Sequence, residues 1–73
     1  MIKQETKEAV LNLPVGGMID VKPRMITYTI YRASETEFAL DRACDGWQSC
    51  IINPAKMEEV LNDEEKFYEL DWE

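Results

Sequence analysis

The chain has 73 residues, of which 15 are acidic and 8 are basic, so its formal net charge is −7 at pH 7. This length predicts one small domain spanning residues 1–73, which buries only about 60% of its unfolded surface and has no room for a deep active-site cavity. The carboxylate excess and the lack of clustered Lys and Arg exclude direct binding to nucleic-acid phosphates and to an anionic membrane surface.

Hydropathy and the cysteines indicate the compartment. No stretch approaches the roughly 20 apolar residues that span a bilayer, and the polar segment after Met1 differs from a signal peptide. We therefore expect a cytoplasmic protein in which Cys44 and Cys50 stay reduced, small and partly buried.

The first 24 residues predict one helix and one short strand. Residues 2–13 are good helix formers. One stripe at helical spacing is formed by Ile2, Thr6, Ala9, Val10 and Leu13. Pro14 and the pair Gly16-Gly17 end this helix. Residues 18–21 follow as a short edge strand that must end near Pro23, because proline cannot donate to a sheet ladder.

Residues 25–52 predict three strands, and the rest of the chain is organised around them. Residues 25–32 and 37–43 alternate apolar and polar side chains with the period of two that indicates a strand. Asp45-Gly46 is a strong hairpin signal, because a type I′ turn requires positive φ at both central residues. Residues 47–52 then form the third strand.

The turn lengths predict which strand residues face each other. A two-residue loop at Asp45-Gly46 places Leu40 opposite Ile51, and likewise pairs Cys44 with Trp47 and Arg42 with Ser49. A three-residue loop over residues 34–36 places Ile30 opposite Leu40. We therefore expect Ile30, Leu40 and Ile51 to form a core row. The opposite face is predicted to be largely solvated and carries Thr27, Thr29, Glu37, Asp41 and Gln48.

The last 21 residues predict helix. Asn53 can cap the first free N–H groups and Pro54 fits the first turn, while Met57, Val60 and Leu61 form an apolar stripe. Asp63 can cap a second helical turn, so one kinked helix and two short ones both fit the pattern. Phe67 and Leu70 are expected beside Trp47 on the sheet, and Trp72 is expected to be exposed.

These elements together predict an α+β fold: an N-terminal helix, a three- to four-stranded antiparallel β-meander, and a C-terminal helical segment packed on one face of the sheet. The sequence has few residues of the types that usually carry out catalysis. There is no histidine, which removes the commonest general base and the partner of the usual Ser and Cys nucleophiles. Adjacent carboxylates such as Glu58-Glu59 diverge on a helix, and Gly16-Gly17 lacks the Lys of a phosphate-binding loop. We expect no enzyme activity, no cofactor and no metal site.

Charge is the most informative functional signal. Residues 53–73 carry eight acidic and two basic side chains, so nearly all of the net charge lies there. A rigid acidic helix can occupy a basic groove, its carboxylates standing in for phosphates and its aromatic side chains for bases. The residues expected to contact such a partner are Glu58, Glu59, Asp63, Glu64, Glu65, Tyr68, Glu69 and Asp71.

We therefore expect a non-catalytic inhibitor or adaptor that binds a protein with a basic surface, of which a nucleic-acid-binding protein is one class. The alternative is a housekeeping module that binds through a sheet edge or an apolar patch, or forms a homodimer through residues 18–21 or 47–52, while the acidity serves solubility. The size, the acidity and the segment 63–68 (DEEKFY) resemble in composition small phage-encoded inhibitors, anti-CRISPR proteins among them. The resemblance implies an inhibitor and assigns a role to no residue.

Overall fold

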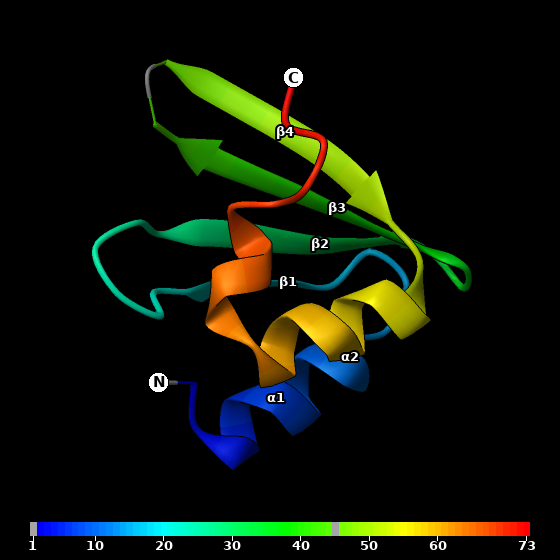
Figure 1. Ribbon diagram of the computed structural model, residues 1–73. Coiled ribbons are helices and arrows are strands. Elements are labelled where there is room, and N and C mark those ends of the chain that lie inside the picture. The colour runs from blue at the N-terminus through cyan, green and yellow to red at the C-terminus, as the bar shows by residue number, and fades with distance from the viewer. Residues whose placement is uncertain (1, 45) are drawn as a thin grey trace.

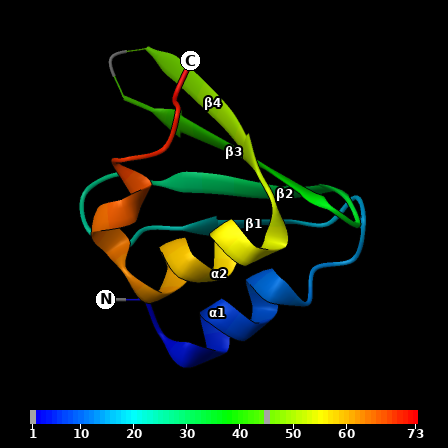
Figure 2. The ribbon, with the colours of Figure 1, turned by 45° about the vertical axis from the view of Figure 1, so that its right-hand side comes forward.

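The computed structural model describes residues 2–44 and 46–73 and confirms the predicted α+β class. Its elements, in chain order, are α1 (Gln4–Leu11), β1 (Met18–Val21), β2 (Tyr28–Ser34), β3 (Glu37–Ala43), β4 (Trp47–Ile52), α2 (Pro54–Asn62) and a 3-10 helix, η1 (Glu64–Phe67). The strands form one antiparallel sheet in the order β1-β2-β3-β4. Figure 1 and Figure 2 show α1 and α2 side by side against one face of the sheet, which leaves the other face uncovered by the described residues.

Short polar side chains define where the C-terminal helices begin. The Asn53 side chain accepts a hydrogen bond from the Lys56 N–H at 2.7 Å, and Pro54 occupies the first turn of α2. Asp63 then accepts from the Glu65 N–H at 3.2 Å and caps η1. The C-terminal segment is therefore two short helices, because Asp63 has extended backbone geometry and interrupts the first one.

The core lies between the covered face of the sheet and the helices. Its fully buried side chains are Tyr28, Phe38, Phe67, Ile30, Leu40, Met57, Leu61, Val10 and Val60. The predicted stripe of α2 is confirmed, since Met57, Val60 and Leu61 are all buried. The stripe of the first helix is confirmed only in part, because Val10 is buried while Ala9 is exposed. The spacing of apolar residues therefore predicted the buried side of α2 better than the buried side of the shorter α1.

The first hairpin has the predicted pairing and a different connection. Ile30 lies opposite Leu40, as expected, and both are fully buried. The connection is a two-residue turn preceded by a β-bulge at Ala33, instead of a three-residue loop. The Arg32 guanidinium holds this bulge, because it donates to the carbonyl oxygens of Ser34 and Glu35, each at 2.8 Å.

The predicted register of the second hairpin is wrong by one residue. Leu40 lies opposite Cys50, Ala43 lies opposite Trp47, and residues 44–46 separate the strands. Gly46 has φ +91°, the left-handed geometry that a three-residue hairpin loop commonly ends with. Asp45, and with it the predicted turn type at Asp45-Gly46, lies outside the described residues.

The shift in register exchanges the two faces of β4. Cys50 is 9% exposed and belongs to the core, whereas Ile51 is 64% exposed, so the prediction that Ile51 completes the core row is wrong. Gln48 also lies on the covered face, not the solvated one, where its side-chain oxygen accepts from Arg42 Nε at 2.8 Å. The three-residue loop places the small Cys50 against Leu40 and brings Ile52 opposite Phe38.

An aromatic cluster secures the C-terminal residues on the covered face. Tyr28 stacks on Phe67 with ring centroids 4.3 Å apart and on Trp72 at 5.7 Å. Trp72 Nε1 donates to the Phe67 carbonyl oxygen at 2.7 Å, and the Arg42 guanidinium lies 4.3 Å from the Trp72 ring. Trp72 is therefore half-buried instead of exposed. Trp47, expected beside Phe67, is 80% exposed because the register turns it to the uncovered face.

Candidate functional site

The predicted acidic segment lies along the helical layer and the residues that follow it. Glu58 and Glu59 are on α2, Asp63 is the cap between the helices, and Glu64 and Glu65 are on η1. Tyr68, Glu69 and Asp71 follow η1. All eight side chains are exposed except that of Glu64, which is half-buried. Seven of the eight predicted side chains therefore lie at the surface.

Several of these carboxylates have partners within the molecule. Glu59 forms ion pairs with Lys66 at 2.6 Å and Lys56 at 3.6 Å, and Glu65 pairs with Arg24 at 2.8 Å. The hydrogen bond from Lys66 lowers the pKa of Glu59, and Glu59 in turn raises the pKa of Lys66. The segment is therefore not one continuous uncompensated surface, because ion pairs interrupt its charge.

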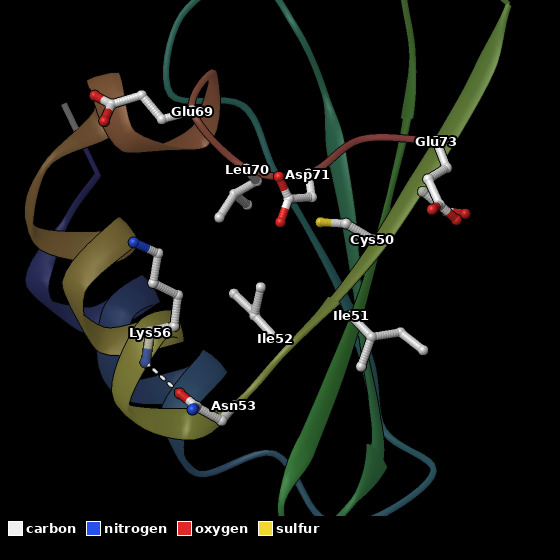
Figure 3. Close-up of a pocket in the computed structure, with 10 residues that line it drawn as sticks. Cys50, Ile51, Ile52, Asn53, Lys56, Glu69, Leu70, Asp71 and Glu73 are labelled. Carbon is white, nitrogen blue, oxygen red and sulfur yellow. Dashed lines mark hydrogen bonds between the residues drawn. The ribbon is translucent and has the colours of Figure 1, made fainter.

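The acids of this segment that take part in no ion pair within residues 2–44 and 46–73 are more dispersed. Glu58 projects from α2, while Glu69 and Asp71 follow η1 near the outer edge of β4. Figure 3 shows the Asp71 carboxylate directed toward the side chains of a groove, whereas the Glu69 carboxylate points away from them. No ion pair with a described residue occupies these three side chains.

The uncovered face of the sheet carries an apolar row that crosses all four strands. The backbone register places Met18 opposite Tyr31, Tyr31 opposite Ala39, and Ala39 opposite Ile51. Met18, Tyr31 and Ile51 are 62%, 39% and 64% exposed. Large apolar side chains that gather on one exposed face are typical of interaction surfaces. This row is the candidate functional site.

Carboxylates flank the apolar row on both sides. A polar row runs beside the apolar row and is formed by Asp20, Thr29, Asp41 and Ser49. It lies two residues further along β1 and β3, which is about 7 Å from the apolar row by strand geometry. Thr29 Oγ1 donates to Asp20 at 2.8 Å, which orients that carboxylate. Glu37 lies on the other side of Ala39, two residues back along β3. None of the strand residues that the structure places on this face is Lys or Arg.

Sequence reasoning missed this row because it depends on the register of β4. The alternation of residues 25–32 and 37–43 already placed Tyr31 and Ala39 away from the core. The assumed two-residue loop turned Ile51 inward, so the face seemed to be polar. The row would have been predicted if a three-residue loop had been assumed at Asp45-Gly46. The glycine did not decide between the two lengths, since either one accommodates a glycine with positive φ.

A groove of about 670 Å³ lies along the outer edge of β4, between this strand, the start of α2 and the residues after η1. Cys50, Ile52 and Leu70 project into it, while Lys56, Glu69 and Asp71 border it (Figure 3). Burial raises the pKa of the Cys50 thiol to about 11 from its ordinary value of 9.0, and this outweighs the opposing effect of Arg42. The thiol is therefore protonated at neutral pH and is a poor nucleophile.

Other functional features are sparse in the part of the chain that the structure describes. Cys44 and Cys50 are not joined in a disulfide. Within residues 2–44 and 46–73, no group of three or more Cys, Asp or Glu side chains is arranged to hold a metal ion. No helix in the same residues is long and apolar enough to span a bilayer.

No protein-family model matches this chain, and comparisons with curated proteins and with solved structures found no match.

Proposed function

We propose that this protein is a non-catalytic protein-binding module, an inhibitor or an adaptor, that binds a basic surface of a partner protein through the uncovered face of its sheet. The observation that carries the proposal is the exposed row formed by Met18, Tyr31, Ala39 and Ile51, with carboxylates on both sides of it. An apolar centre with a charged border is the usual anatomy of a protein–protein interface.

The two kinds of side chain have different roles in this proposal. Burial of a large apolar side chain contributes about 1.5–3 kcal/mol relative to leaving it exposed, so Tyr31 and Ile51 provide affinity. Asp20, Glu37 and Asp41 attract a partner that presents Lys or Arg around an apolar ridge, and they accelerate association at low salt. A basic partner therefore fits both the geometry and the charge of this face.

Charge argues against a second copy of this chain as the occupant. A twofold dimer brings the same surface of two copies together. Such a face-to-face pair would bring Asp20, Glu37 and Asp41 near one another with no Lys or Arg among the strand residues of this face to neutralise them. Sedimentation at high protein concentration checks this point, and it also detects pairing of two copies through a sheet edge.

The C-terminal acids are a second candidate contact region. Glu58, Glu69 and Asp71 are exposed and form no ion pair with any described residue. They favour the version of this function in which carboxylates imitate phosphates and occupy the groove of a nucleic-acid-binding protein in the cytoplasm. The internal ion pairs of Glu59 and Glu65 weaken this candidate relative to the sheet face.

The test compares capture of partner proteins by variants of the two regions. Tyr31→Ser and Ile51→Ser remove apolar side chains from the sheet face, and Asp41→Lys reverses a bordering charge. Val15→Ser is the matched control, because Val15 is 57% exposed outside the strands. The proposal expects a captured protein whose affinity, remeasured with the purified partner, falls about tenfold or more in the face variants and stays unchanged in the control.

Two results would count against the proposed site. Binding that survives the face variants but is lost on Glu58→Lys, Glu69→Lys and Asp71→Lys moves the site to the C-terminal acids. Partner affinity that does not weaken between low and high salt contradicts a basic partner, because steering by carboxylates is screened by ions.

A further inference from the structure

The outer edge of β4 pairs with another part of the chain at one residue. Ser49 donates its N–H to the Glu73 carbonyl oxygen and accepts from the Glu73 N–H, both at 3.0 Å. Two bonds exchanged by one pair of residues are the signature of an antiparallel hydrogen-bonded pair. This edge is therefore competent to accept an added strand.

Ile51 is the next β4 residue whose backbone groups point to the outer edge of the sheet. Backbone groups of a strand point alternately to its two neighbours, so the N–H and C=O of Ile51 point away from β3, like those of Ser49. Continuing the same antiparallel register would place Asp71 opposite Ile51. The chain instead turns at this point, where the Trp72 N–H donates to the Leu70 carbonyl oxygen at 2.9 Å, and the described residues provide no backbone partner for Ile51.

The groove of about 670 Å³ lies where the chain and β4 separate. Cys50, Ile52 and Leu70 give it an apolar floor, while Ile51 points away from it (Figure 3). Its border carries one basic side chain, Lys56, and three acidic ones, Glu69, Asp71 and Glu73. Lys56 is moreover 3.6 Å from Glu59, so the border is negative.

We propose that this edge is a second binding site, which takes an extended segment of a partner protein as an added strand opposite Ile51. The segment places an apolar side chain on the floor formed by Cys50, Ile52 and Leu70, and it carries Lys or Arg nearby for Asp71. Main-chain hydrogen bonds supply affinity in this mode of recognition, and alternate side chains supply specificity. The site shares Ile51 with the uncovered face but uses its backbone groups, whereas the face uses its side chain.

The test uses the capped peptide acetyl-TVTK-amide as the probe, which ends before the position opposite Ser49 that Glu73 already fills. With its second Thr opposite Ile51, its Val and Lys side chains face the groove, since directly opposed residues share a face. The matched probes are acetyl-TVTE-amide and acetyl-TVTK-amide with an N-methylated second Thr. We expect the Lys peptide to bind with slowed hydrogen exchange at the Ile51 amide, and both matched probes to bind about tenfold more weakly or less.

A protein variant tests the same bond from the other side. Ile51→Pro removes the outward N–H but no ladder bond to β3, so an edge strand tolerates it, and Ile51→Val is the control that keeps the N–H. We expect Ile51→Pro to weaken peptide binding about tenfold and Ile51→Val to leave it unchanged. If Ile51→Pro fails to fold, the N-methylated peptide still measures the loss of one backbone hydrogen bond.

The outcomes separate this site from the proposed function. Equal binding of the plain and N-methylated peptides, or an Ile51 amide that exchanges at the same rate with and without peptide, overturns strand addition. Tyr31→Ser, which alters the uncovered face, is expected to leave peptide affinity unchanged, so the two proposals fail or stand separately.

Discussion

The two faces of the sheet are formed by the same strands, but one is buried by the helices and the other is exposed. The covered face buries Tyr28, Ile30, Phe38 and Leu40 completely against the helices. The uncovered face exposes Met18, Tyr31 and Ile51, although these side chains are similarly apolar. The difference shows that hydrophobicity alone does not assign a strand residue to the core, because the pairing register decides which side of the sheet each residue faces.

The largest expected contrast is between core and surface truncations. Phe38→Ala is expected to lower the free energy of unfolding by about 3–5 kcal/mol, because it removes a fully buried ring and leaves a cavity. Ile51→Ala is expected to change it by less than about 0.5 kcal/mol, because the side chain is mostly in water. Urea denaturation of both variants measures the difference, and similar losses would break the comparison of the two faces.

The two tryptophans provide a matched pair on opposite faces. Trp72→Ala removes a stack with Tyr28, a hydrogen bond to Phe67 and a cation–π contact with Arg42. We expect a loss of about 2–3 kcal/mol, below the range for a fully buried aromatic ring. Trp47→Ala is expected to cost less than about 0.5 kcal/mol, since Trp47 is 80% exposed. Thermal unfolding followed by circular dichroism compares them, and a larger loss for Trp47 would contradict the assigned register.

A substitution in the second hairpin tests the turn that sets this register. Gly46 has φ +91° and no neighbouring atom within 4 Å of an added Cβ, so Gly46→Ala introduces backbone strain without a clash. We expect a loss of about 1–2 kcal/mol, with a smaller loss for Gly46→Asn, because Asn tolerates the left-handed region better. Chemical denaturation of both variants is the measurement, and equal stability of Gly46→Ala and the parent chain would argue for a different backbone at this turn.

The smallest expected change in stability concerns the Cys50 thiol and develops only above pH 9.0. Because burial raises its pKa to about 11 from 9.0, its contribution to stability is complete below pH 9.0 and is lost as the pH rises through about 11. Comparing Cys50→Ala with the parent chain across this range isolates the contribution, since other groups titrate equally in both. The parent chain is expected to lose stability more steeply, and parallel profiles would indicate a thiol in contact with water.

Part of the fold could be predicted from local pattern. The start of α2 follows from Asn53 and Pro54, whose effects on the first helical turn act over a few residues. The pairing of Ile30 with Leu40 follows from alternation in both strands, although the bulge at Ala33 was not anticipated. The exposure of the acidic segment also followed, because carboxylates are rarely buried.

The candidate surfaces depended on contacts between distant residues. Cys50 and Ile51 are adjacent and both apolar, so composition does not show which of them the core takes. The ion pair between Arg24 and Glu65 joins residues far apart in the chain and cannot be read from spacing. The same holds for the pairing of Ser49 with Glu73, which leaves the edge beside Ile51 open.

The sequence by itself determined the elements of this protein, their order and the sign of its charge, because propensity, alternation and capping act over a few residues. Only the tertiary structure decided that Ile51 joins Met18, Tyr31 and Ala39 on the uncovered face, and which carboxylates are neutralised. The physical reason is that side chains alternate between two faces of a strand, so a single residue in one loop decides which set is buried.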